Sequence, residues 1–207
     1  LVPRLKAALE DLNPDMPEAG IAKAIDALTL DRRVMPPADA ARDFHGLLKG
    51  GVPVEVEAKR GGVETRIVRV IDWGEPRANH FFAATEFWVK GEIYDRRPDV
   101  VGFVNGLPLL LMELKAPHVS CRKAFDDNLS DYLGTVPQLF TPNALTILTN
   151  GTDAKLGSAF APWDHFYQWK KLESEAEPPK VSLERAVRGV ATPERLLDII
   201  ENFTVFE

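Results

Sequence analysis

The residues best suited to chemistry in this chain are two carboxylates and a lysine in an otherwise apolar stretch. Glu113 and Lys115 follow the apolar run Leu107–Met112, and Asp99 begins the preceding apolar segment. Side chains alternate between the two faces of a strand, so Glu113 and Lys115 point the same way and Leu114 points the opposite way. Burying either charge alone is costly. The stretch therefore predicts either a functional site or a buried Glu–Lys ion pair, with Asp99 only capping a strand.

The turn at Asn105-Gly106 decides whether Asp99 shares a face with Glu113. If these two residues formed a two-residue hairpin loop, Asp99 would lie opposite Met112 and on the face of Leu114. A three-residue loop that begins one residue earlier, with its glycine in the left-handed conformation, would put Asp99 on the face of Glu113. A bulge elsewhere in the hairpin would restore the same parity. The functional interpretation therefore predicts a one-residue irregularity in this hairpin.

If the three side chains converge, they suit metal-assisted hydrolysis of a phosphodiester. Two carboxylates, Asp99 and Glu113, can hold a hard divalent cation, which prefers oxygen ligands. The backbone carbonyl of Leu114 would supply a further ligand, because it lies between the two polar positions. The cation withdraws charge from the phosphate and acidifies a bound water. Lys115 is placed to orient or help deprotonate that water, or to hold a phosphate oxygen.

The elements that must position these residues are predicted from the apolar periodicity and from turn residues. In chain order they are helices within 1–30 and over 39–48, a β-hairpin over 52–71, strands over 81–89, 99–104 and 107–115, a helix over 123–133, strands over 144–150 and 155–160, and a helix from 192. This order predicts an α/β fold with a mixed central β-sheet flanked by helices.

The chain divides into three expected parts. Residues 1–50 form an N-terminal helical segment, and residues 51–171 form a core with a leading β-hairpin. Residues 172–207 form an acidic connector, with glutamates at 173, 175 and 177, and a final helix.

Composition excludes several classes of protein. Of the 207 residues, 45% are hydrophobic and 27% are charged, which is enough for a core and excludes wholesale disorder. No apolar run approaches the roughly 20 residues of a membrane span. The single cysteine, Cys121, excludes an internal disulfide framework and a cysteine cluster for zinc. A net charge of −6 excludes a strongly basic nucleic-acid clamp.

The wider sequence around the polar residues resembles a known family. Pro98-Asp99 followed by Glu113-x-Lys115 matches the loose signature of the PD-(D/E)xK nuclease superfamily. More specific similarity lies in the segments 79–82, 96–101, 103–109, 113–115, 136–140, 150–152 and 202–206. Over nearly its whole length the chain resembles the N-terminal nuclease domain of the R (HsdR) subunit of type I restriction enzymes.

The resemblance implies a magnesium-dependent endonuclease with a restriction-endonuclease-like core. By correspondence, Asp99 and Glu113 are metal ligands and Lys115 is the catalytic lysine. The family also carries a Gln and a Tyr four residues apart on the following helix. Here those positions are Asn128, one methylene shorter than Gln, and Tyr132. Residues four apart share a helix face, so both are expected to support the site, with half-buried packing as the alternative for Tyr132.

The same family couples DNA cleavage to ATP-driven translocation. The sequence contains no G-x-x-x-x-G-K-[ST] phosphate loop, so this chain is expected neither to bind nor to hydrolyse ATP, and the motor is expected beyond residue 207. The resemblance implies double-stranded DNA as substrate, the methylation and specificity subunits as partners, and a cytoplasmic location without a membrane. Because the chain is acidic, we expect it to bind DNA weakly on its own.

Other residues give weaker signals. Arg96 and Arg97 flank Asp99 and are candidates for holding DNA phosphates, with solvated loop charge as the alternative. His80 precedes a core strand and is a candidate to approach the site. A group of aromatic residues could stack on single-stranded bases, although we expect it to be part of the core. Its members are Trp163, Phe166, Tyr167 and Trp169.

The sequence leaves two other functions open. The chain could be a catalytically inert assembly module that keeps a nuclease fold, or it could be a repair or junction nuclease of the same superfamily. Substitution of Glu113 or Lys115 distinguishes the inert module from a nuclease. Helicase motifs beyond residue 207 would distinguish a type I restriction subunit from a repair or junction nuclease.

Overall fold

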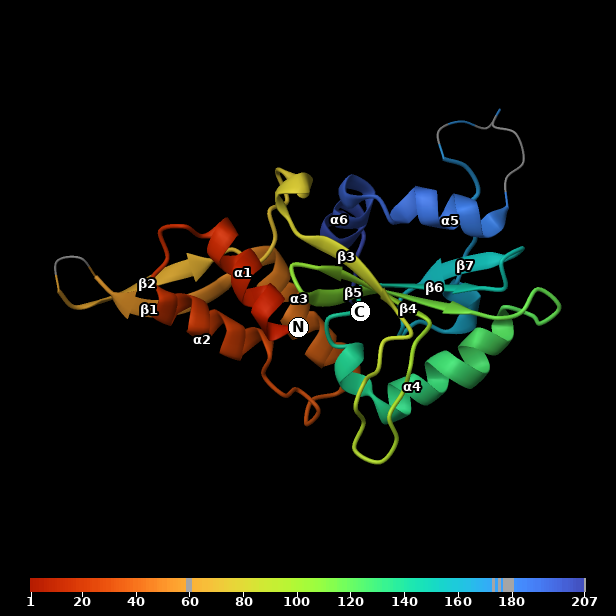
Figure 1. Ribbon diagram of the computed structural model, residues 1–207, viewed down its shortest axis with the longest axis horizontal. Coiled ribbons are helices and arrows are strands. Elements are labelled where there is room, and N and C mark those ends of the chain that lie inside the picture. Colours follow the sequence, from red (N-terminus) through yellow and green to blue (C-terminus); the bar gives the residue numbers. More distant parts are fainter. Residues whose placement is uncertain (59–60, 173, 175, 177–180, 207) are drawn as a thin grey trace.

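The computed structural model describes residues 1–58, 61–172, 174, 176 and 181–206 (Figure 1). The helices are α1 (Val2–Leu12), α2 (Glu18–Leu28), α3 (Pro37–Gly50), α4 (Ser130–Thr135), α5 (Ser182–Val190) and α6 (Pro193–Asn202). The strands are β1 (Val52–Glu57), β2 (Val63–Val68), β3 (Phe81–Thr85), β4 (Val100–Val104), β5 (Leu107–Leu114), β6 (Leu145–Thr149) and β7 (Ala154–Gly157). The shorter turns are the 3₁₀ segments η1 (Pro76–Ala78), η3 (Pro137–Leu139) and η4 (Trp163–His165) and the π-helical η2 (Ala124–Leu129).

A five-stranded sheet in the order β3-β4-β5-β6-β7 forms the centre of the fold. Strand β4 is antiparallel to both β3 and β5, β6 runs parallel to β5, and β7 is antiparallel to β6. The parallel pair needs a crossover connection, which the segment carrying η2 and α4 provides. The expected mixed sheet flanked by helices is confirmed.

Two hydrophobic clusters cover the two faces of this sheet. One face packs against the N-terminal helices, the β1–β2 hairpin and helices α5 and α6, and the other packs against η2, α4 and η3. The neighbours Ile147 and Leu148 on β6 belong to different clusters, and every residue of β6 is buried. Strand β6 is therefore covered on both sides, as is usual for a strand with a parallel neighbour.

The hairpin of β1 and β2 is a separate two-stranded sheet beside α2 (Figure 1). Val52, Val54 and Val56 on β1 are buried and alternate with exposed residues. A two-stranded hairpin alone is marginally stable, so its apolar face has to be covered by the N-terminal helices. The segment Arg60-Gly61-Gly62 predicts the turn of this hairpin, and Arg60 lies outside the described residues.

Two expected strands are shorter than predicted, and one helix was not predicted. Strand β3 ends at Thr85, because Glu86 has a φ of 50° that no regular strand accommodates. Strand β7 also ends earlier than expected. Helix α5 was not predicted. The glutamates at 173, 175 and 177, which belong to the expected acidic connector, lie outside the described residues. Gly189 weakens the helical signal of α5 but is needed there, because a Cβ would lie 2.4 Å from the indole nitrogen of Trp169.

Candidate active site

The loop that joins β4 to β5 is the two-residue turn Asn105-Gly106. Both residues have positive φ, 52° and 83°, as a type I′ hairpin turn requires. Val104 pairs with Leu107, so the three-residue loop does not form. With regular pairing throughout the hairpin, this turn would put Asp99 on the face opposite the other site residues.

A β-bulge at Leu109 returns Asp99 to the same face of the sheet as Glu113. Phe103 pairs with Pro108 and Gly102 pairs with Leu110, so Leu109 is an extra residue on β5. Leu109 and Leu110 accordingly pack in the same hydrophobic cluster, although neighbours on a regular strand face opposite sides. A Cβ at Gly102 would lie 3.1 Å from the Cβ of Leu110, so glycine permits this close approach. The predicted one-residue irregularity is confirmed.

Beyond the bulge, Asp99 lies opposite Glu113, because Val100 pairs with Met112. The N–H of Leu114 donates to Asp99 Oδ2 at 2.7 Å, and the N–H of Asp99 approaches Glu113 Oε2 at 3.4 Å. The N–H and C=O of one extended residue point to the same side of its strand, so the carbonyl of Leu114 also faces Asp99. Two carboxylates and one carbonyl therefore meet at the open end of the hairpin.

Glu113 is a buried carboxyl group with only 3% of its surface exposed. Burial, and then the neighbouring Asp99 carboxylate, raise the pKa of Glu113 from 4.5 to about 7. Its Oε1 accepts hydrogen bonds from Asn128 Nδ2 at 2.6 Å and from the Tyr132 hydroxyl at 3.2 Å. Burial raises the pKa of Tyr132 to about 12, so this hydroxyl remains a donor at neutral pH. A cation beside Glu113 would favour its charged form.

Lys115 is held beside the carboxylates by an amide. Its Nζ donates to Asn128 Oδ1, and its backbone N–H donates to the carbonyl of Thr149 on β6 at 2.8 Å. Asn128 thus accepts from Lys115 and donates to Glu113. Among the described residues, no direct ion pair joins Glu113 to Lys115, so the arrangement differs from the simple buried pair that was the structural alternative.

The two expected supporting residues both lie at this site. Asn128 belongs to η2 and Tyr132 to α4, and Asn128 Nδ2 lies 3.4 Å from the Tyr132 hydroxyl. Tyr132 is 6% exposed, so it both packs in the core and donates to Glu113. The shorter side chain of Asn128 still reaches both charged groups.

Arg96 and Arg97 lie at the edge of the site and already have acidic partners. Arg96 donates to both carboxylate oxygens of Asp131 on α4. Arg97 lies 3.4 Å from Glu86 Oε1, and its guanidinium lies over the ring of Trp88. A DNA phosphate would have to compete with these contacts, and the more exposed Arg97 is the better candidate of the two.

His80 lies at the opposite end of the hairpin from Asp99. Its Nε2 is 3.1 Å from Asp11 Oδ2, and its backbone N–H donates to Asn105 Oδ1 at 2.7 Å. The length of β4 separates these contacts from the carboxylates. The expectation that His80 approaches the site is wrong.

The aromatic group near residue 165 is mostly packed against other side chains. The ring of Trp163 has the guanidinium of Arg122 at 5.3 Å and the ammonium of Lys155 at 4.7 Å. Phe166 is buried, whereas Tyr167 is 66% exposed. Packing is therefore confirmed for Phe166, and the ring of Trp163 is already in contact with two cations.

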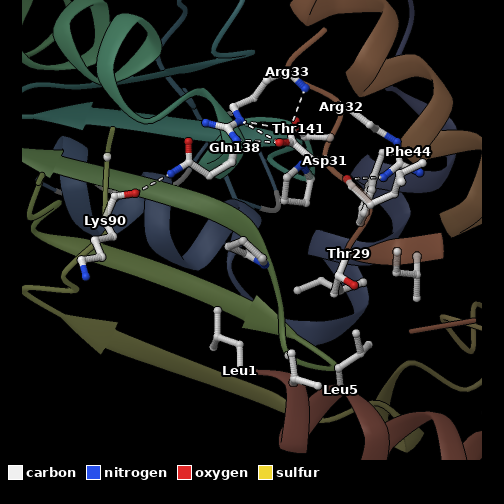
Figure 2. Close-up of a pocket in the computed structure, with 18 of the residues that line it drawn as sticks. Leu1, Leu5, Thr29, Asp31, Arg32, Arg33, Phe44, Lys90, Gln138 and Thr141 are labelled. Atoms are coloured by element: carbon white, nitrogen blue, oxygen red, sulfur yellow. Dashed lines mark hydrogen bonds and ion pairs between the residues drawn. The ribbon is translucent and has the colours of Figure 1, made fainter. Parts of the chain in front are cut away.

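A cleft of about 490 Å³ lies elsewhere, between the N-terminal helices and the segment 90–142. Figure 2 shows Gln138 donating to the carbonyl of Lys90, at 2.7 Å, and Arg33 bonded to Asp31. The carboxylates and the lysine of the candidate site do not line this cleft.

Within the part of the chain that the structure describes, no group of three or more His, Cys, Asp and Glu side chains is arranged to hold a metal ion. The hairpin end instead brings two carboxylates together, those of Asp99 and Glu113. Over the same described residues, none of the helices combines the length and apolarity that a bilayer crossing requires.

A mixed sheet with a polar site at the open end of one hairpin makes this an α/β protein with a restriction-endonuclease-like architecture. Residues 1–165 match the family described as the N terminus of the type I restriction enzyme R protein. The chain therefore belongs to this family.

Relatives from two organisms agree with this assignment. The type I restriction enzyme HindI endonuclease subunit of Haemophilus influenzae is 30% identical over 214 residues, covering 100% of this chain and 20% of that protein. A Methanocaldococcus jannaschii protein, provisionally named the type I restriction enzyme MjaIXP endonuclease subunit, is 28% identical over 187 residues, covering 79% of this chain and 18% of that protein. The chain thus spans about a fifth of the length of these curated relatives.

Proposed function

We propose that this chain is the magnesium-dependent nuclease part of a type I restriction enzyme R subunit and hydrolyses phosphodiester bonds of double-stranded DNA. The observation that supports this most is the bulge at Leu109, beyond which Asp99 lies opposite Glu113. The names of the relatives, which are endonuclease subunits, support it independently.

The donors at the hairpin end fit a hard divalent cation. Asp99 accepts the N–H of Leu114 through Oδ2, which leaves Oδ1 for a ligand bond. Glu113 is buried and has a raised pKa, so a nearby cation would offset the cost of its charge. Magnesium prefers oxygen ligands and retains several waters, so Asp99, Glu113 and the carbonyl of Leu114 would be sufficient. When bound, magnesium would withdraw charge from the phosphate and acidify a water.

The remaining residues hold and orient the reacting groups. The ammonium of Lys115 donates to the attacking water or to a phosphate oxygen, next to the carboxylates. Asn128 fixes the distance between Lys115 and Glu113, because it bonds to both. Tyr132 donates to the same oxygen of Glu113 and keeps that carboxylate oriented. Loss of such a partner of a ligand group typically weakens metal binding by about 10- to 100-fold.

Delivery of DNA belongs to the rest of the enzyme in this proposal. Cleavage is coupled to an ATP-driven translocase outside these 207 residues, and the methylation and specificity subunits bring the complex to DNA in the cytoplasm. The net charge of −6 supports this division, since non-specific affinity for DNA comes largely from Lys and Arg contacts to phosphates.

The test uses Glu113→Ala and Lys115→Ala in the intact restriction enzyme. Cleavage should fall by about 1,000-fold or more, because each change removes a group that stabilises the transition state. ATP hydrolysis and translocation should continue at their normal rates. Lys23→Ala, which removes an exposed lysine on α2, is the matched control and should cleave normally.

Cleavage at the normal rate by Lys115→Ala or Glu113→Ala would show that the nuclease assignment is wrong. That result would support the alternative of an inert assembly module.

A further inference from the structure

The helix that carries Asn128 and Tyr132 contains one π-helical turn. This turn, η2 (Ala124–Leu129), ends where the N–H of Ser130 donates to the carbonyl of Phe125, five residues back instead of four. The hydroxyl of Ser130 donates to the same carbonyl at 3.0 Å. A π turn is rare and is often found at functional sites, so its position beside the candidate site calls for a physical reason.

The reason lies in the spacing of the residues that face the sheet. Ala124, Asn128 and Tyr132 follow one another at intervals of four, Ala124 and Tyr132 are buried, and Asn128 reaches Glu113. In a regular α-helix four residues overshoot one turn by about 40°, because a turn takes about 3.6 residues. Ala124 would then be rotated by about 80° from Tyr132. The wider π turn takes more residues per turn and removes this overshoot, so all three share one face.

The rotation is large compared with the tolerance of the hydrogen bonds. A 40° rotation moves a Cα on a helix of about 2.3 Å radius by about 1.6 Å. Asn128 has a short side chain and makes a 2.6 Å bond to Glu113 Oε1 while its Oδ1 accepts from Lys115. A displacement of that size would break one or both bonds, since the donor–acceptor distance of an N–H···O bond normally lies between about 2.7 and 3.2 Å.

We propose that the π-helical turn η2 positions Asn128 between Glu113 and Lys115, and that Ser130 is a positioning residue that stabilises this turn. The carbonyl of Phe125 accepts two hydrogen bonds from Ser130. One comes from the backbone N–H, as the π turn requires, and the other comes from the hydroxyl. The consequence for metal binding rests on the proposed function, whereas the consequence for the geometry of Asn128 does not.

The helix offers a matched control for Ser130. The hydroxyl of Thr135 donates to the carbonyl of Asp131 at 2.7 Å, four residues back, in the α-helical part of the same helix. Ser130→Ala and Thr135→Ala therefore each delete one hydroxyl that bonds to a backbone carbonyl. Only the first of these hydroxyls belongs to the π turn. Ser130→Thr keeps the hydroxyl, so it should preserve the π turn and the position of Asn128.

Two measurements on the 207-residue chain test the proposal. The first is the affinity for manganese alone by calorimetry, and the second is the NMR signal of the Asn128 side-chain amide. Ser130→Ala should bind manganese about tenfold more weakly, the lower end of the usual effect of disturbing a ligand's partner, and should shift the Asn128 amide signal. Thr135→Ala and Ser130→Thr should change neither. Deletion of Asp127, an exposed residue of η2, should shift the amide signal further.

The outcomes separate this inference from the proposed function. If the Asn128 amide signal is unchanged in Ser130→Ala, the positioning role of Ser130 is wrong, even if the Asp127 deletion does not fold. If Asp99→Asn abolishes manganese binding while Ser130→Ala retains it in full, the metal site stands and the role of the π turn in it is wrong. If Asp99→Asn binds manganese normally, the proposed metal site itself is wrong, and the amide signal alone decides the role of Ser130.

Discussion

The two ends of the β4–β5 hairpin each hold a buried polar cluster, and the two clusters differ in kind. At the turn end, the fully buried Asn105 donates to the carbonyl of Val70 and to Asn79 Oδ1, both at 2.8 Å, and accepts the N–H of His80. These groups are neutral amides whose hydrogen bonds are satisfied. At the open end, the buried group is Glu113, a carboxyl beside a second carboxylate.

This difference separates a structural use of buried polarity from a functional one. Neutral amides that satisfy one another fix the turn and require nothing further. Two neighbouring carboxylates repel each other, and burial adds to the cost, so their arrangement is unfavourable in the folded chain alone. Perturbed carboxyl groups of this type are concentrated at functional sites. The turn end should therefore matter for stability and the open end for chemistry.

Asn105→Ala should give the largest loss of stability. It removes two donated bonds and one accepted bond in a buried position, and it places alanine at a φ of 52°. Together these changes should lower the free energy of unfolding by about 4 kcal/mol, measured by urea denaturation. Asn105→Gly keeps the backbone conformation and should lose less, so it separates the hydrogen bonds from the strain. A loss below about 1 kcal/mol for Asn105→Ala would contradict the structural role of this cluster.

Glu113 should make stability fall as the pH rises. Its pKa is about 7 in the fold, above the value of 4.5 for a free carboxyl, so between these values the folded chain holds a proton that the unfolded chain releases. Its contribution to stability is therefore present below pH 4.5 and lost through pH 7, and amounts to on the order of 3 kcal/mol. Urea denaturation in metal-free buffer across this range measures it. Glu113→Gln should remove this slope, whereas Glu55→Gln, at an exposed position of β1, should retain it.

His80→Ala should have the smallest effect. The side chain is 47% exposed and its contact with Asp11 is a surface pair, so the change in unfolding free energy should stay below about 0.5 kcal/mol. The backbone N–H that bonds to Asn105 is retained in this variant. Cleavage by the intact enzyme should also be unchanged, and a large loss of cleavage would mean that the turn end takes part in the chemistry.

The sequence predicted the sheet class and the polar residues of the site, but not how they converge. Alternation put Glu113 and Lys115 on one face, and Asn105-Gly106 indicated the turn. The run Leu109-Leu110-Leu111 contains three identical side chains, so it carries no alternation from which the bulge could be located. The convergence of Asp99 with Glu113 therefore depended on a register that the residues alone left open.

Other misses have similar physical reasons. His80 was placed near the site because it precedes a strand, but adjacency to a strand does not say which end of the sheet a residue reaches. The single four-residue interval between Asn128 and Tyr132 is also found on one face of an α-helix, so these two residues alone did not reveal the π turn. The burial of Asn105 depends on the segment around Val70, which is distant in the chain.

The extra leucine on β5 also has a genetic consequence. Loss of a single codon among those for Leu109, Leu110 and Leu111 would remove one leucine and leave the segment as apolar as before. It would nevertheless turn Glu113 away from Asp99, because one missing residue exchanges the two sides of the strand. In-frame deletions in this leucine run should therefore inactivate the protein as thoroughly as substitution of an acidic group, while point changes from one aliphatic residue to another should be tolerated.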